Sequence, residues 1–440
     1  MNLTRNPLVD HFRCPESLVP VQLDRDGAQT AHAALVKSNG DYGLTLPSHP
    51  SQLIDDLRLE KYPLAAESKA ALSKPQAIRS LYYALRPMMP VAIRKWAQRA
   101  YLSRWQSLQF PKWPVDCTVE IILKELLSLC LKIQKIDALP FIWFWPHGKK
   151  SCLIVTHDVE TTAGRNFTDK LMDLDDQYEV KSSFQVIPKE RYEVPGSYLA
   201  EIRARGFEIN VHDLTHDGSL IREHDNFLRH AHEINQFGRE WGASGFRTGA
   251  LYRMQEWFDA LEFEYDMSVP TVASLDPQRG GCCTVFPYFI GNLLELPLTT
   301  TQDYSLFHIL NDYSIDIWQK QIDLICRQNG LISFIVHPDY IIANHARQCY
   351  VRLLEFIREL REPQELWVTL PGELNRWWRA RQRTMLVKKG SQWIIAGPAR
   401  RDARIAFARV ENDQIVFEIE SLEPQSEANS TSDAMIEVPR

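Results

Sequence analysis

The chain has 440 residues, a length that at roughly 100–200 residues per domain predicts two or three domains. Hydrophobic residues make up 45% and charged residues 24% of the chain, which is typical of a folded globular protein and excludes a disordered, collagen-like or disulfide-scaffold chain. The chain contains 50 Lys and Arg and 56 Asp and Glu residues, so its net charge is −6. Because this charge offers no excess of cations to neutralise phosphates, we expect no nucleic-acid partner.

The first residues lack the apolar core of a signal peptide, and no apolar run in the sequence approaches the roughly 20 residues that cross a bilayer. The cysteines are scattered along the chain and include no CxxC pair, a distribution that is typical of reduced thiols. Together these features predict a cytoplasmic protein.

Residues 1–145 are interrupted by Pro and show helical spacing of apolar residues near 92–105 and near 119–136, so we predict a mainly helical N-terminal region. Basic and aromatic residues alternate over 86–105, and a helix of this kind can contact an anionic membrane surface. The alternative, which we favour, is that this helix packs on the rest of the chain with its Arg side chains in solvent.

From about residue 151 onward, short apolar runs alternate with amphipathic stretches. The apolar runs predict strands at 152–155, 182–187, 207–211, 245–247, 293–298, 331–336 and 366–370. The amphipathic stretches predict helices at 166–178, 197–205, 220–237, 255–261, 315–328 and 343–360. This alternation predicts an α/β fold of parallel βαβ units, in an open sheet or a barrel, with the functional site at the carboxyl ends of the strands.

After Pro371 the sequence predicts a helix with Trp377 and Trp378, and then a small β-rich module. Its strands are expected at 385–387, 393–396, 404–409 and 414–419. The last residues are polar, and we expect a disordered tail. The predicted parts of the chain are therefore an N-terminal region (1–145), a catalytic domain (146–372), a helix with a small β module (373–420) and the tail (421–440).

Two carboxylates follow the first strand of the predicted catalytic domain, in the segment Thr-His-Asp-Val-Glu at 156–160. Asp158 and Glu160 are two residues apart in an extended segment, so their side chains point the same way. Such a pair suits a metal ligand beside a general base, or two catalytic acids. The alternative is a turn followed by the first turn of a helix, where acidic residues are common.

Two histidines, His212 and His216, follow the predicted strand at 207–211. At this spacing the two side chains project from one face of a helical turn and can chelate one metal ion. The alternative is a pair of surface histidines near the start of a helix. Their position at a second strand end favours the metal site.

Two further candidates, Arg247 and His337, lie at the ends of other predicted strands, and a third, Asp266, follows the predicted helix at 255–261. The pKa of a His suits proton transfer near neutral pH. Taken singly, each of the three also fits a structural role, such as a salt bridge or a turn. Together with the carboxylates and the His pair, they supply the ligands, the base and the acid that metal-assisted hydrolysis requires.

In their order and spacing, these residues resemble the polysaccharide deacetylase family (NodB homology, carbohydrate esterase family four) over about half of the chain. The family's motifs for two acids, a metal-binding His pair, an Arg, an Asp and a closing Leu-x-x-His element match, in that order, 156–160, His212 with His216, Arg247, Asp266 and 334–337. The resemblance implies a distorted (β/α) barrel.

The resemblance also implies a metal-dependent deacetylase, a hydrolase of carbon–nitrogen bonds other than peptide bonds. Its substrate would be an N-acetylated sugar or glycan intermediate, and O-acetyl groups are the less favoured alternative. The ion, Zn²⁺ or another divalent transition metal, would be held by Glu160, His212 and His216.

The catalytic roles follow from the same resemblance. Asp158 would act as the general base, oriented and kept ionised by Arg247. His337 would act as the general acid, with Asp266 supporting its charged form.

The sequence departs from the family pattern at Val159, which in an ungapped match occupies the place of the metal-binding Asp, so that Glu160 would supply the carboxylate instead. The Arg motif also lacks the Pro and aromatic residue that normally follow it. Two alternatives therefore stay open: hydrolysis of another non-peptide C–N amide bond, and a non-catalytic glycan-binding protein that keeps the fold.

Overall fold

A computed structural model describes residues 6–19, 50–62, 105–361 and 365–420. Within these ranges, the largest sheet has nine strands. Six of them pair side by side in parallel, in the order β2 (Ser151–Val159), β3 (Ser183–Val186), β4 (Glu208–His212), β5 (Gly245–Arg247), β6 (Tyr265–Asp266) and β8 (Leu293–Glu295). The remaining three are β9 (Leu331–Ile335) and β10 (Leu366–Val368), both parallel to β2, and β7 (Tyr288–Ile290), antiparallel to β8.

Strand β2 has three neighbours in this sheet. Its residues 152–156 pair with β9, its residues 151–153 with β10, and its residues 156–159 with β3. Residues 152 and 153 of β2 pair with both β9 and β10, and residue 156 pairs with both β9 and β3. Strand β9 therefore lies along one edge of β2, and β10 and β3 lie along the opposite edge. All nine residues of β2 are buried, which explains their continuous apolar character up to Thr156.

Threonine side chains join the two ends of the curled sheet. Oγ1 of Thr299, which follows β8, donates to the Leu331 carbonyl at 2.8 Å and accepts from the Ser333 amide at 2.9 Å. Oγ1 of Thr300 donates to the Ser333 carbonyl at 2.7 Å. The prediction of an α/β fold with a distorted barrel is therefore confirmed, and side-chain hydrogen bonds to β9 replace a regular backbone ladder at the closure.

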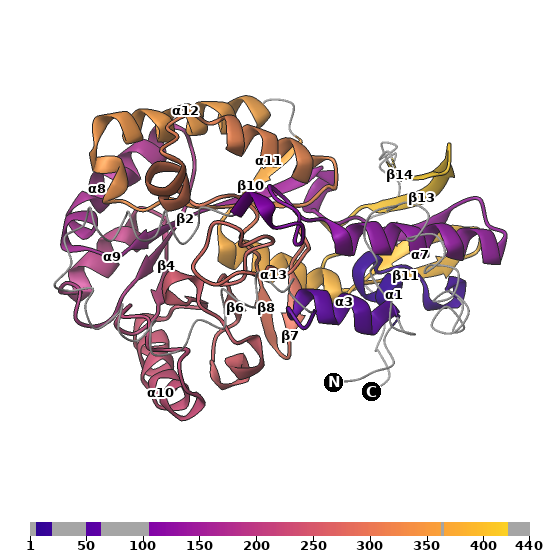
Figure 1. Cartoon of the computed structure of the whole chain (residues 1–440). Coiled ribbons are helices and arrows are strands. Elements are labelled where there is room, and N and C mark those ends of the chain that lie inside the picture. The colour runs from indigo at the N-terminus through magenta and orange to yellow at the C-terminus, as the bar shows by residue number, and fades with distance from the viewer. Residues whose placement is uncertain (1–5, 20–49, 63–104, 362–364, 421–440) are drawn as a thin grey trace, which may run out of the picture.

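Figure 1 shows the helices of this domain around the outside of the sheet. They are α8 (Thr162–Gln177), α9 (Gly196–Ala204), α10 (His224–Trp241), α11 (Asp316–Cys326) and α12 (Asn344–Arg361). Helix α8 begins directly after Glu160, because the Thr161 side chain accepts a hydrogen bond from the Gly164 amide at 3.0 Å and caps the helix. The cap ends the β2 segment at a defined point and so places Glu160 at the edge of the sheet.

Short helical turns occupy several of the connections. They are η1 (Glu16–Leu18), η4 (Trp105–Ser107), η5 (Pro146–Gly148), η6 (Gly249–Leu251), η7 (Gln255–Ala260), the π-helical η8 (Ser305–Leu310) and η9 (Tyr340–Ile342). The helix predicted at 255–261 is thus a 3-10 helix.

The N-terminal region and the C-terminal module are joined in one small sheet. Strand β1 (Leu139–Ile142) pairs antiparallel with β13 (Ile405–Glu411), which pairs with β14 (Gln414–Ile419). Figure 1 shows α7 (Thr118–Gln134) beside these strands. The other two predicted strands of the module form a separate hairpin, β11 (Met385–Lys389) with β12 (Gln392–Ala396).

One buried cation ties these parts together. Helix α13 (Pro371–Gln382) carries Arg381, which is fully buried and donates to the carbonyl oxygens of His11, Ile142 and Trp143 at 2.9, 2.7 and 3.0 Å. The carbonyl of His11 belongs to the end of α1 (Pro7–Phe12), and the other two belong to the last residue of β1 and the residue after it. The structure also describes α3 (Pro50–Arg58) in the N-terminal region.

The predicted helix near 92–105 and the tail at 421–440 lie outside the described residues, and so does nearly all of the segment 86–105 that we considered for membrane contact. Among the helices that the structure describes, none combines the length and apolar character that crossing a membrane requires.

A buried carboxyl group on α7 allows a test of the fold. Glu120 is buried, and its Oε1 accepts a hydrogen bond from the Thr284 hydroxyl, which links α7 to the barrel. Burial raises the pKa of Glu120 to about 7, although Thr284 and Arg58 act in the opposite direction. Glu120 therefore stabilises the fold when it is protonated, and this contribution is lost as the pH rises from the unfolded-state value through about 7.

We predict that Glu120→Gln, which stays neutral at every pH, matches the wild type near pH 4.5 and is more stable near pH 8 by roughly 2–3 kcal/mol. Urea unfolding at both pH values measures the difference. Glu125→Gln on the same helix serves as the control and should change stability equally at both. A Glu120→Gln effect that does not change with pH would contradict the buried, protonated carboxyl group.

Candidate metal and catalytic site

The predicted site residues come together at one edge of the large sheet. Asp158 is the penultimate residue of β2, His212 ends β4, Arg247 ends β5, and His337 follows β9. Because parallel strands present their carboxyl ends at the same edge, residues far apart in the sequence meet there.

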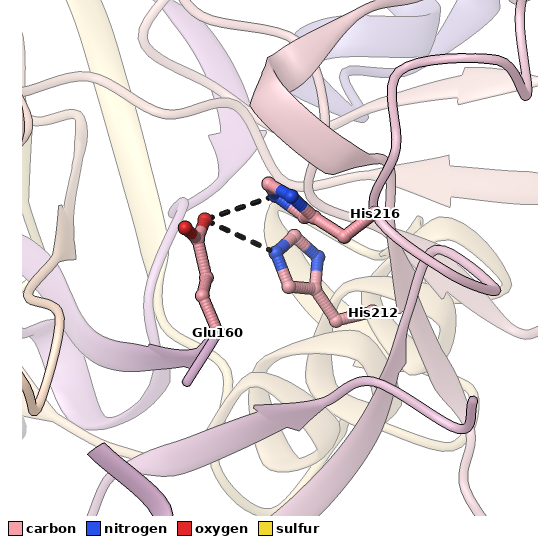
Figure 2. Close-up of side chains that lie close together, drawn as sticks. All are labelled: Glu160, His212 and His216. Carbon is pink, nitrogen blue, oxygen red and sulfur yellow. Dashed lines mark ion pairs between the residues drawn. The ribbon is translucent and has the colours of Figure 1, made fainter. Parts of the chain in front are cut away.

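The Glu160 carboxylate lies opposite the imidazoles of His212 and His216 (Figure 2). Its Oε1 is 2.9 Å from Nε2 of His216 and 3.7 Å from Nε2 of His212. One donor atom from each of these residues lies within 4.8 Å of the other two, a spacing that suits a single metal ion. Asp158, Glu160 and His337 meet the same criterion, so Glu160 belongs to both groups.

The hydrogen bonds of His212 favour metal binding. Its Nδ1 lies 3.1 Å from the Arg247 carbonyl oxygen, and because a carbonyl only accepts, Nδ1 carries the proton. When the ring is neutral, Nε2 has the lone pair that can bind a metal ion, and this buried atom has no hydrogen-bond partner among the described residues. Backbone hydrogen bonding of the other ring nitrogen is the usual arrangement of a metal-ligating His. Two imidazoles and a carboxylate fit Zn²⁺ or a similar divalent transition ion.

The prediction of a helical turn from His212 to His216 is wrong. His212 is in β4, and the chain then turns with Asp213 and His216 in the left-handed region, at φ 56° and 53°. The Asp213 amide donates to the Arg247 carbonyl at 2.8 Å, and its carboxylate accepts from the Gly249 amide at 3.0 Å. A spacing of four residues therefore brings both rings to the Glu160 carboxylate through an irregular turn that Asp213 holds against β5.

Gly249 makes this turn fit. A Cβ at this position would lie 2.4 Å from Oδ2 of Asp213 and 2.9 Å from Cδ2 of His216. The sequence Thr-Gly-Ala after Arg247, which departs from the family pattern, thus has a steric reason: the turn that carries His216 packs directly against the backbone of residue 249.

Asp158 forms a buried ion pair with Arg247. Its Oδ1 lies 2.5 Å from Nη1 of Arg247, which also donates to the Thr156 hydroxyl at 2.8 Å. Burial alone would raise the pKa of Asp158, but the charge of Arg247, with those of His212 and His337, outweighs burial and lowers it. Asp158 is therefore an ionised carboxylate at neutral pH, as a general base must be.

His337 is held by Asp303, a residue that the sequence analysis missed. The His337 amide donates to Oδ2 of Asp303 at 2.7 Å, and its Nδ1 lies 2.6 Å from Oδ1. Burial acts to lower the pKa of His337, but Asp303 and Glu160 outweigh it and raise the pKa well above the ordinary value. The ring is therefore protonated near neutral pH, as a general acid must be. The available signal was the position of Asp303 shortly after the predicted strand at 293–298.

Asp266, which we expected to support His337, lies elsewhere. It accepts hydrogen bonds from the amide and hydroxyl of Ser268 at 2.9 and 2.8 Å, beside the buried carboxyl group of Glu295. The Ser268 hydroxyl in turn accepts from the Thr248 amide at 2.9 Å. Asp266 thus holds the backbone next to Arg247, and the partner of His337 is Asp303.

No protein-family model and no curated protein matches the chain. Several solved structures are similar to it. A protein assigned as a polysaccharide deacetylase from Mycobacterium smegmatis has 17% identity and a TM-score of 0.43 over 57% of this chain and 98% of that chain. The Puue allantoinase has 13% identity and a TM-score of 0.41 over 53% and 92%. The Bc1960 peptidoglycan N-acetylglucosamine deacetylase has 14% identity and a TM-score of 0.34 over 52% and 89%. The family that the motifs resemble is thus represented among these structures.

The contact between Gly249 and His216 yields a prediction about ion binding. In Gly249→Ala the added methyl group displaces the turn that carries His216, so we expect the affinity for a divalent ion to fall by about tenfold or more. Competition with a chromophoric chelator measures the affinity. Gly196→Ala is the matched control, because a Cβ there would have no atom within 4 Å. Equal affinities of the two variants would show that the turn does not set the position of His216.

Proposed function

We propose that this protein is a metal-dependent hydrolase that removes an acetyl group from an N-acetylated sugar or glycan intermediate. The observation that carries the proposal is a buried, unpartnered imidazole nitrogen of His212 beside Glu160 and His216, flanked by an ionised Asp158 and a protonated His337. This set includes ligands, a base and an acid, and it favours hydrolysis of an amide.

Glu160, His212 and His216 would hold the ion, for which we propose zinc. When bound, such an ion supplies Lewis acidity to the acyl carbonyl group and to the attacking water. The ligands come from the end of β2 and from β4 with its following turn, so the folded sheet supplies them already assembled.

Asp158 would accept the proton of the attacking water. Its Oδ1 is occupied by Arg247, and its Oδ2 faces the ligands, 3.7 Å from Nε2 of His212. Arg247 thus has two effects on the base, since it keeps the carboxylate ionised and limits its rotation.

His337 would protonate the departing amine. An amide nitrogen is a poor leaving group until it receives a proton, so the reaction needs an acid on the side of the leaving group. With Nδ1 hydrogen-bonded to Asp303, the proton on Nε2 is the one that can be transferred, and this atom lies 3.4 Å from Glu160 at the ligand group.

The substrate class rests on the resemblance of the motifs. The expected cytoplasmic location favours a biosynthetic intermediate over mature wall polysaccharide. The alternative of a non-catalytic glycan-binding protein depended on Val159, which occupies the place of the metal-binding Asp and is buried in the hydrophobic core. The next residue, Glu160, places a carboxylate beside the histidines instead, and this favours an enzyme over a non-catalytic protein. The other alternative, hydrolysis of a different non-peptide C–N amide bond, would be distinguished from deacetylation by a substrate screen in which the products are identified.

We predict that His216→Ala loses both the bound ion and hydrolysis, because it removes one of three ligands. Mass spectrometry measures the metal content per chain, and hydrolysis is measured as the release of acetate from N-acetylated oligosaccharides. His232→Ala, an exposed residue of α10, should keep both. A wild type that binds zinc but releases no acetate would exclude deacetylation of these substrates, and His216→Ala with full metal content and turnover would exclude the ligand set.

Asp158→Asn should behave differently, with kcat reduced by about a thousandfold while the ion remains bound, since the amide can no longer accept the proton. Metal content and kcat are measured on the same preparation, and Asp173→Asn on the exposed side of α8 serves as the control. If Asp158→Asn instead loses the ion, Asp158 is itself a ligand and another group must act as the base.

A further inference from the structure

His157 lies beside Asp158 on β2 and projects from the opposite face of the strand, because successive side chains alternate. Its ring is fully buried. Nε2 lies 3.0 Å from Oδ2 of Asp175 on α8, and Nδ1 lies 3.0 Å from the carbonyl oxygen of Val336. Val336 is the residue immediately before His337, so this ring links the strand that carries the base to the residue next to the acid.

The surroundings of His157 fix the ring firmly. The Asp175 carboxylate also accepts from the hydroxyl groups of Ser182, at 2.7 Å, and Tyr350, at 2.6 Å. The rings of Phe184 and Tyr350 lie 5.0 and 6.0 Å from the imidazole, centroid to centroid. Contacts from α8, α12 and the start of β3 therefore leave the imidazole one orientation.

The bond to Val336 occurs where the regular ladder between β2 and β9 stops. The last paired residues are Thr156 and Ile335, and the Val336 amide still donates to the Thr156 carbonyl at 3.0 Å. Beyond this point the His337 amide turns to Asp303, and Pro338 has no amide proton. In the described structure, the buried Val336 carbonyl accepts from the His157 ring instead of from the next backbone amide, which satisfies a group that would otherwise be costly to bury.

We propose that His157 is a positioning residue: its Nδ1–H bond to the Val336 carbonyl sets the place of His337 relative to Asp158. His337 is then held from two sides, by Asp303 at its amide and ring and by His157 through the preceding carbonyl. This inference rests on the proposed function, in which Asp158 and His337 transfer protons on the same substrate. A displacement of about 1 Å in such a group is enough to lower kcat.

Two variants separate positioning from stability. His157→Asn keeps an N–H donor near the place of Nδ1 and can still donate to Val336, whereas His157→Gln keeps a donor near Nε2 for Asp175 and loses the bond to Val336. We expect kcat of the Gln variant to fall by about tenfold or more with KM and metal content unchanged, and that of the Asn variant to stay within about threefold of the wild type. Tyr350→Phe removes a donor from Asp175 and should lower the urea midpoint without lowering kcat.

A second readout does not depend on turnover. In protein labelled with ¹⁵N-histidine, the proton between His337 and Asp303 gives a downfield NMR signal, identified by its loss in Asp303→Asn. We expect this signal to move in the Gln variant and to stay in place in the Asn variant. If the Gln variant does not fold, His157→Phe, which preserves the packing against Phe184, carries the same expectation.

Equal kcat values and equal signals in the Asn and Gln variants would overturn the inference, as would a Gln variant that matches the wild type. Failure of the proposed function is a separate result, since a wild type without hydrolytic activity leaves the NMR comparison able to decide whether His157 positions His337.

Discussion

The site depends on one carboxylate oxygen atom, Oε1 of Glu160. Nε2 of His216, His337 and His212 lie 2.9, 3.4 and 3.7 Å from it. Burial alone raises the pKa of a carboxyl group, yet the facing histidines keep the pKa of Glu160 well below its ordinary value. A half-buried ionised carboxylate is stabilised by such partners, and they come from β4, from the turn after β4 and from the residues after β9, which meet the end of β2 at one edge of the sheet.

Three elements of the site are fixed by partners from another part of the chain. Arg247 holds Asp158, Asp303 holds His337, and the backbone of Arg247 and Gly249 holds the turn that carries His216 through its hydrogen bonds to Asp213. These partners are themselves buried. Such a site is preorganised, because each of these orientations is determined by hydrogen bonds that already exist.

The same contacts give Asp158 and His337, the proposed base and acid, opposite charges at neutral pH. Arg247 lowers the pKa of Asp158, and Asp303 raises the pKa of His337, in each case against the effect of burial. Two titratable groups whose environments separate their pKa values in this direction form a base and an acid that are ready at the same pH. This electrostatic arrangement favours the proposed hydrolysis over passive binding.

The sequence by itself determined most of the parallel strands, although not β6, and the residues at their carboxyl ends, Asp158, Glu160, His212, Arg247 and His337. It could do so because apolar runs, helical spacing and side-chain alternation are local properties of the chain. Only the tertiary structure decided that Asp303 pairs with His337 and that Asp266 instead supports Thr248. It also decided that the His turn is irregular, since the turn depends on the missing Cβ of Gly249, a residue on the next strand connection. Such pairings depend on which segments meet when the sheet curls, and that information is not contained in any single segment.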